Sequence, residues 1–168
     1  LKKLKAIYPQ ILTFDEFLDF GISKKKSLLL ETKHPVPSHT KIEEVIVERL
    51  AKEKLRIKKA EIDITVMSFS WFAVEKMKAL NKEISTTYLL HDYTPWFTAR
   101  YSSAKSIGPG INLLRKNPAL AKRIKNTGRT LNVWTVNDAS DIKLCHQLGV
   151  DNLITNRPGY AREVLNNI

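Results

Sequence analysis

The sequence predicts an incomplete TIM (β/α)8 barrel, an α/β fold with about six βα units. Short apolar, β-branched runs alternate along the 168 residues with capped amphipathic segments, which is typical of a parallel sheet covered by helices. No glycine-rich phosphate loop follows any run, which weakens the alternative of an open doubly wound sheet. A complete barrel takes about 250 residues. We therefore expect residues 1–168 to be one N-terminally truncated domain, with the natural N-terminus upstream of Leu1.

Six segments are short, apolar and bounded by polar residues, Gly or Pro, which predicts strands. They cover residues 27–33, 62–69, 84–90, 107–114, 130–136 and 150–155. The fourth is the weakest, because Gly108, Pro109 and Gly110 interrupt it. Residues 92–106 have no clear period and are expected to form a long loop with room for a short helix.

Capping signals predict where the helices begin. The capping box, in which Thr and Glu three residues apart satisfy each other's backbone N–H groups, occurs at Thr13–Glu16 and at Thr40–Glu43. Asn117 followed by Pro118 marks a further start, and Gly128 closes that helix. Other helices are expected to begin near Trp71, Asp138 and Pro158.

The chain is strongly basic, with 28 Lys and Arg against 17 Asp and Glu and a net charge of +11. This favours anionic partners, but the basic runs are short and lack interleaved aromatic residues, so nucleic acid is not expected. No apolar run is long enough to span a bilayer. Without a signal peptide at the start, we expect a cytoplasmic protein, with secretion left open. The single cysteine, Cys145, is expected to be a small core residue.

Glu31 and Lys33 are candidate site residues from their position alone. They alternate on one expected strand, so their side chains point to the same side. They also lie at its C-terminal end, where barrel enzymes place catalytic groups. A structural ion pair, or a strand-end pair that reaches solvent, explains them equally well.

Four motifs occur in order over nearly the whole chain. They are Leu-Glu-Thr-Lys-His-Pro at 30–35, Met-Ser-Phe at 67–69, Val-Trp-Thr-Val-Asn at 133–137 and Gly-Val-Asp-Asn-Leu-Ile-Thr-Asn-Arg-Pro at 149–158. Together they resemble the Glu-x-Lys, Ser-Phe, Trp-Thr-Val-Asn and closing Ile-Thr-Asp-x-Pro motifs of the glycerophosphodiester phosphodiesterase family. One departure is Asn156, which stands where many members have Asp.

The resemblance implies metal-dependent hydrolysis of a small-molecule glycerophosphodiester to glycerol 3-phosphate and an alcohol. Glu31 matches a carboxylate ligand of a divalent cation, Ca²⁺ or Mg²⁺, and Lys33 matches the catalytic lysine that meets the substrate phosphate. Trp134 matches the aromatic residue near the glycerol, and Ser68 ends a strand beside the pocket as a further substrate-binding candidate.

The family's opening His-Arg-Gly, its second histidine and two carboxylate ligands are not found in the sequence. Those histidines are the family's acid and base, so the resemblance implies that residues 1–168 alone are inactive. Of the four histidines present, only His91, which ends a strand next to Asp92, is a candidate replacement. A barrel short of two strands would also expose two unpaired edges and, we expect, an apolar lumen.

Three other functional classes remain open. A sphingomyelinase-D-like or other lipid phosphodiesterase on the same barrel would add lipid-facing aromatic loops, and Trp96, Phe97 and Tyr101 are candidates. A loop covering the barrel rim explains the same residues. A non-catalytic basic protein that binds nucleic acid would show salt-dependent retention on DNA without needing divalent cations. A degenerate barrel retained only for binding is a third possibility.

Overall fold

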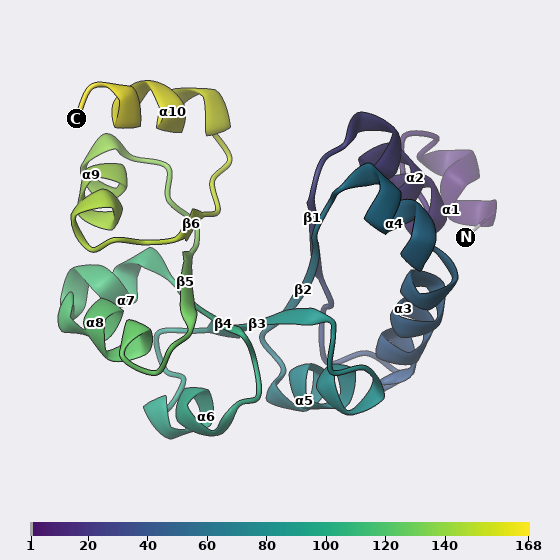
Figure 1. Ribbon diagram of the computed structural model, residues 1–168, viewed down its shortest axis with the longest axis horizontal. Coiled ribbons are helices and arrows are strands. Elements are labelled where there is room, and N and C mark those ends of the chain that lie inside the picture. Colours follow the sequence, from purple (N-terminus) through teal and green to yellow (C-terminus); the bar gives the residue numbers. More distant parts are fainter. Residues whose placement is uncertain (1) are drawn as a thin grey trace.

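The fold is an open arc of six parallel strands, as the sequence predicts. The computed structural model describes residues 2–168, with side chains from Lys5 onward. The strands pair in sequence order, as β1 (Leu28–Glu31), β2 (Ile64–Ser68), β3 (Ser85–Leu90), β4 (Ser106–Pro109), β5 (Thr130–Val133) and β6 (Asn152–Leu153). Figure 1 shows the helices outside the arc and an opening between β1 and β6. The expected incomplete barrel is confirmed.

The helices lie between the strands in the alternation that the caps predicted. They are α1 (Lys2–Ile7), α2 (Phe14–Lys24), α3 (Lys41–Lys52), α4 (Lys54–Ala60), α5 (Trp71–Leu80), α6 (Trp96–Tyr101), α7 (Ile111–Lys116), α8 (Ala119–Lys125), α9 (Ala139–Gln147) and α10 (Pro158–Asn166). The short helix expected within residues 92–106 is α6. Each strand is shorter than its predicted range, because pairing ends where the loops begin.

The apolar side of the sheet faces the helices. One core cluster joins β1 and β2 to α2, α3 and α5, and contains Leu18, Leu30, Ile46, Val66 and Met77. A second joins β3, β4 and β5 to the later helices, and contains Leu90, Ile107, Leu114, Leu131 and Ile142. Cys145 belongs to it and is 0% exposed, as expected, and this burial raises the pKa of its thiol to about 12.

The inner side of the arc is polar, so the expected apolar lumen is wrong. Strand register places Glu31, Met67 and Thr87 side by side on that face, followed by Ser106 and Thr130, and Met67 is the one apolar residue in this row. Two asparagines continue the polar surface: Asn132 Nδ2 donates to Thr87 Oγ1 at 3.0 Å, and Asn152 Nδ2 donates to Asn132 Oδ1 at 2.9 Å. The sequence did not reveal this polar face, because the apolar residues that identify each strand are mostly those that face the helices.

The segment expected as one strand at 107–114 is a strand followed by a helix. Strand β4 ends at Pro109, which has no N–H to donate to a ladder. Gly110 is the N-cap of α7, in which Ile111 is 7% and Leu114 0% exposed. Their spacing of three residues places both on one face of the helix. The same apolar residues are also compatible with a strand, which is why the strand prediction extended too far.

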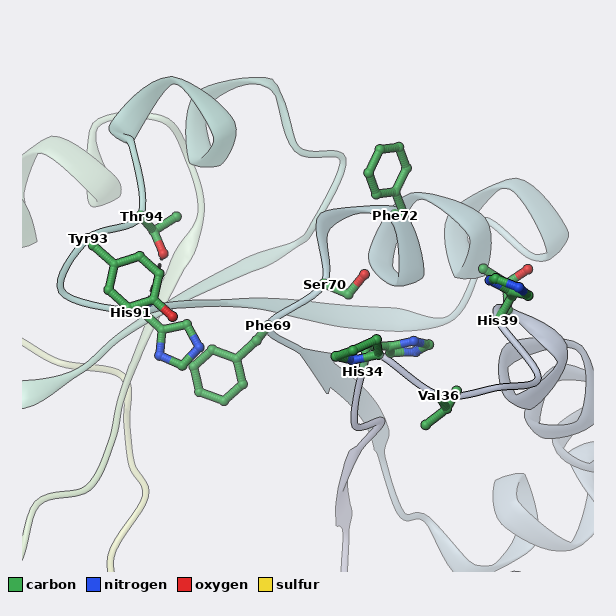
Figure 2. A pocket seen from close by; sticks show the side chains of 11 residues that line it. His34, Val36, His39, Phe69, Ser70, Phe72, His91, Tyr93 and Thr94 are labelled. Atoms are coloured by element: carbon green, nitrogen blue, oxygen red, sulfur yellow. Dashed lines mark hydrogen bonds between the residues drawn. The ribbon is translucent and has the colours of Figure 1, made fainter.

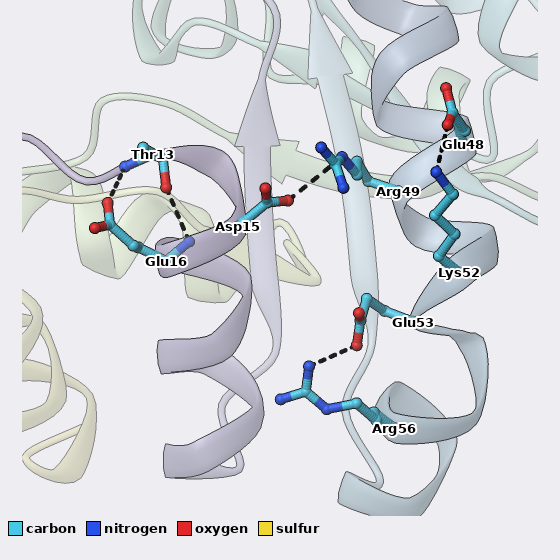
Figure 3. Close-up of polar contacts among 8 residues, drawn as sticks. All are labelled: Thr13, Asp15, Glu16, Glu48, Arg49, Lys52, Glu53 and Arg56. Carbon is cyan, nitrogen blue, oxygen red and sulfur yellow. Dashed lines mark hydrogen bonds and ion pairs between the residues drawn. The ribbon is translucent and has the colours of Figure 1, made fainter. Parts of the chain in front are cut away.

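The capping box at the start of α2 is confirmed (Figure 3). The Glu16 backbone N–H donates to Thr13 Oγ1 at 3.1 Å, and the Thr13 N–H donates to Glu16 Oε2 at 2.7 Å. The Lys5 ammonium donates to the same carboxylate at 2.6 Å, and these hydrogen bonds lower the pKa of Glu16 to about 2.

Exposed ion pairs join the neighbouring helices. Arg49 of α3 lies 3.6 Å from Asp15 of α2, and Arg56 of α4 lies 2.7 Å from Glu53 (Figure 3). Such solvent-exposed pairs contribute about 0–1 kcal/mol each, so the buried clusters dominate the stability. None of the described helices has the length and apolarity needed to cross a membrane.

Gly108 is expected to be intolerant of a side chain. A Cβ at this position would lie 2.6 Å from Leu89 Cδ2 and 3.3 Å from the Asn132 carbonyl oxygen. We expect Gly108→Ala to lower the free energy of unfolding by about 2 kcal/mol, measured by urea titration. Gly159→Ala is the control, because a methyl group added there would meet no atom within 4 Å. Equal stability of the two variants would contradict the tight packing.

Candidate active site

The sequence-predicted site residues lie at one end of the parallel strands. Glu31 is the last residue of β1, Ser68 is the last of β2, and Trp134 directly follows β5. This is the C-terminal edge, as expected for a barrel enzyme. Three strands separate β1 from β5, so Glu31 and Trp134 lie on opposite arms of the arc (Figure 1).

Glu31 and Lys33 form an accessible ion pair. Lys33 lies in the loop just past β1, and its Nζ donates to Glu31 Oε1 at 2.7 Å. The Lys33 side chain is 80% exposed and that of Glu31 is 25% exposed. Neither group therefore carries a large desolvation cost. A carboxylate and an ammonium held together at an open strand end can bind a cation, a phosphate or both.

Trp134 is fixed by the strand next to it. Its Nε1 donates to the Gly108 carbonyl at 2.8 Å, and its own carbonyl accepts from the Ile111 N–H at 2.6 Å. A Cβ on Gly110 would lie 3.4 Å from the indole ring, so the glycine leaves room for the tryptophan. The interrupted β4 sequence is therefore what allows Trp134 to lie over the strand ends.

Four rings form an aromatic cluster at the ends of β2, β3 and β5. The His91 ring stacks on Phe69 with centroids 4.0 Å apart and on Tyr93 with centroids 5.1 Å apart (Figure 2). Trp134 meets Phe69 edge-on at 5.1 Å and His91 at 6.2 Å. The sequence singled out His91 and placed Phe69 in a motif, but it gave no signal for Tyr93.

A cavity of about 720 Å³ opens beside this cluster, over the ends of β1, β2 and β3 (Figure 2). It is lined by His34, Pro35, Val36, His39, Thr40, Phe69, Ser70, Phe72, His91, Tyr93 and Thr94. Three of the four histidines line it, and no carboxylate does. The volume lies in the usual range for small-molecule sites, about 300–1,000 Å³.

His34 is held by the buried carboxylate of Glu43, which the sequence predicted to cap a helix with Thr40. Its Nε2 lies 2.8 Å from Glu43 Oε1, and the Glu43 side chain is 0% exposed. The expected capping box at Thr40–Glu43 is therefore wrong. Thr40 has φ −88° and ψ 14°, away from the extended conformation of a cap, and its side chain makes no capping hydrogen bond. Nothing in the local sequence pairs Glu43 with His34.

Ser68 lies at the predicted strand end, but its side chain is 1% exposed. Its hydroxyl donates to the Thr32 carbonyl at 2.9 Å and accepts from the Ser70 N–H at 3.2 Å. These contacts join the loops that follow β1 and β2. Ser68 therefore shapes the cavity wall through the backbone around it.

The closing signature fixes the last loop through hydrogen bonds. Asn137 Oδ1 accepts from the Thr155 hydroxyl at 3.1 Å and from the Asn156 backbone N–H at 3.0 Å. Asp151 Oδ2 accepts from the Leu131 N–H at 2.8 Å. Because Asn156 contributes its backbone, its departure from the family's Asp leaves these contacts unchanged.

The described residues do not make a metal site by themselves. Among the side chains of residues 5–168 no group of three His, Cys, Asp or Glu is placed to hold a metal ion. Ca²⁺ and Mg²⁺ take about six or more oxygen ligands, whereas Glu31 supplies one carboxylate. Glu31 can therefore act as a ligand only in a site that other groups complete.

Comparison with known proteins gives a consistent match. A family model described as the glycerophosphoryl diester phosphodiesterase family matches residues 1–160. The chain is 27% identical over 159 residues to a Mycobacterium tuberculosis protein named probable glycerophosphodiester phosphodiesterase 1, covering 90% of this chain and 58% of the relative. It is 28% identical over 158 residues to the Bacillus subtilis glycerophosphodiester phosphodiesterase, covering 90% and 53%. The chain thus spans just over half the length of these relatives.

Solved structures share the fold at low identity. An Oleispira antarctica phosphodiesterase, in complex with the product sn-glycerol-3-phosphate, has a TM-score of 0.70 and 19% identity, covering 92% of this chain and 61% of that one. A Parabacteroides distasonis glycerophosphodiester phosphodiesterase has a TM-score of 0.69 and 21% identity, covering 92% and 64%. The arc of strands is therefore similar to a large part of these enzymes' folds.

Proposed function

Because this chain belongs to the glycerophosphoryl diester phosphodiesterase family, we propose that it carries part of the active site of an enzyme that hydrolyses glycerophosphodiesters. The products would be glycerol 3-phosphate and a free alcohol. The observation that carries the proposal is the family match over residues 1–160, with the Glu31–Lys33 pair at an open strand end. The names of the M. tuberculosis and B. subtilis relatives support the same reaction.

Each candidate residue has a proposed role in that reaction. Lys33, with an exposed ammonium, would neutralise charge that builds on the phosphate as the ester bond breaks. Trp134 would form the wall against the glycerol. Glu31 would supply one oxygen ligand to a Ca²⁺ or Mg²⁺ ion, and such an ion, when bound, polarises a phosphodiester oxygen.

A lipid phosphodiesterase on the same barrel is the second candidate. On α6, the Phe97 side chain is 61% and that of Tyr101 is 72% exposed, as a lipid-facing loop requires. Trp96 instead packs under the Arg123 guanidinium, 4.5 Å from the ring centroid. Hydrolysis of lysophosphatidylcholine in preference to glycerophosphocholine would favour this candidate.

The first candidate is tested at Lys33. In an active form of the protein, we expect Lys33→Met to lower kcat/KM for glycerophosphocholine about 10- to 100-fold. A charge-assisted hydrogen bond contributes about 1.5–3 kcal/mol, and each tenfold in rate is about 1.4 kcal/mol. Lys33→Arg should restore part of the activity, and Lys58→Met on α4 is the matched control. Unchanged kinetics in Lys33→Met would exclude a role in phosphate binding.

A further inference from the structure

A fully buried carboxylate positions an imidazole in the wall of the large cavity. Glu43 is 0% exposed, and His34 is the only hydrogen-bond partner that the described residues give it. Its second oxygen, Oε2, is buried without a partner within residues 5–168. Burying a carboxylate in this way costs free energy, and α3 also loses the side-chain cap that Thr40 and Glu43 could have formed. The Glu43–His34 pair therefore forms despite the desolvation of the carboxylate and the loss of a helix cap.

The geometry leaves one edge of the His34 ring available. The Nε2 atom of His34 is the ring nitrogen that meets Glu43 Oε1, whichever tautomer the ring takes. Nδ1 is then the remaining polar atom of the ring, and no partner for it occurs among the described side chains and backbone. His34 is one of the residues that line the cavity.

The lining favours an oxygen-rich ligand over a quaternary ammonium. Besides His34, the hydrogen-bonding side chains in the wall are His39, Thr40, Ser70, His91, Tyr93 and Thr94, and no carboxylate is present to attract a cation. Cation–π binding needs an open ring face. Phe69 and His91 stack on each other at 4.0 Å, so these two faces are closed. Phe72 and Tyr93, 75% and 81% exposed, keep open faces, but the seven hydrogen-bonding side chains outnumber them.

The cavity also lies apart from the glycerol side of the proposed site. Phe69 and His91 line it, whereas Trp134, which contacts both of them edge-on, does not. If Trp134 contacts the glycerol, the cavity is left for the other half of the diester. This assignment rests on the proposed function.

We propose that this cavity is the subsite for the departing alcohol and that it selects polyol headgroups, with His34 as a binding residue. Nδ1 of His34 hydrogen-bonds a headgroup hydroxyl, and Glu43 is the positioning residue that orients the ring. Glycerophosphoinositol and glycerophosphocholine are suitable probes, because they share the glycerol phosphate half and differ in the alcohol.

The test compares the two esters in an active form of the protein. We expect kcat/KM for glycerophosphoinositol to exceed that for glycerophosphocholine about tenfold. His34→Gln can keep a hydrogen bond to Glu43 while removing the Nδ1 edge, so the buried carboxylate stays paired. This variant should raise KM for the inositol ester about tenfold, the effect of one or two lost hydrogen bonds, and leave its kcat and the KM of the choline ester unchanged.

Variants of Glu43 separate positioning from folding. Glu43→Leu should reproduce the rise in KM, and Glu43→Gln, which still accepts from Nε2, should restore most of the wild-type value. His146→Gln, on the exposed side of α9, is the matched histidine control. If Glu43→Leu does not fold, the kinetics of His34→Gln decide the matter.

The outcomes distinguish the two proposals. Equal kcat/KM for the two esters, a preference for the choline ester, or an unchanged KM in His34→Gln would overturn the headgroup subsite while leaving the reaction intact. Hydrolysis of neither ester would contradict the proposed function and the inference that rests on it.

Discussion

Replacing Glu31 by Gln is expected to lower kcat/KM for a glycerophosphodiester about 10³-fold in an active form of the protein. The proposed role is that of a cation ligand, and a bound metal contributes several kcal/mol of charge stabilisation; 10³-fold corresponds to about 4 kcal/mol. Gln keeps the size of the side chain but removes the charge. Because Glu31 is the last residue of β1 and partly exposed, the change should leave the core intact.

The measurement is a titration of activity with Mg²⁺ and with Ca²⁺ for the wild type and Glu31→Gln. A ligand role predicts that the variant needs a higher cation concentration for half-maximal activity. Glu48→Gln, which removes an exposed carboxylate paired with Lys52 on α3, is the matched control. Unchanged turnover would rule out the ligand role. Reduced turnover with an unchanged cation titration would instead assign Glu31 to orienting Lys33 through their 2.7 Å contact.

Local sequence signals predicted most of the fold. Strand and helix alternation gave the order of all six strands, and Thr13–Glu16 gave a capping box that the structure contains. The same signal failed at Thr40–Glu43, because the Glu43 side chain is used by His34 from the preceding loop. The strand signal failed after Pro109, where Ile111, Leu113 and Leu114 fit a strand and the buried side of a short helix equally well.

The candidate site was only partly accessible to sequence reasoning. Motifs and strand ends identified Glu31, Lys33 and Trp134, since parallel strands bring their C-terminal ends to one edge. The stack of His91 on Phe69 and Tyr93 depends on how two loops approach each other. Residue spacing along the chain does not predict how these two loops contact each other. The same holds for the polar inner face, whose members occur on five different strands.

A polypeptide made of residues 1–168 alone is expected not to hydrolyse glycerophosphodiesters, and this is the largest effect that we predict. The histidines that the family resemblance implies as acid and base are not found in residues 1–168, and each general acid–base step contributes about 10²–10⁴-fold. The described residues also place no cluster of three potential metal ligands together. Without the acid–base groups and a complete metal site, we expect turnover below detection. This holds also if the polar inner face keeps the short form soluble.

The check is to express residues 1–168 and a form that includes any sequence flanking them in the gene, and to assay both on glycerophosphocholine with Mg²⁺ or Ca²⁺. Circular dichroism of the short form separates inactivity from failure to fold, since the outer edges of β1 and β6 have no partner strand within residues 2–168. Activity in the short form would contradict the prediction. His91 would then be the foremost candidate for proton transfer, because stacking on Phe69 and Tyr93 holds its ring at the cavity wall. Loss of that activity in His91→Gln, with Tyr93 and Phe69 unchanged, would establish the histidine as its source.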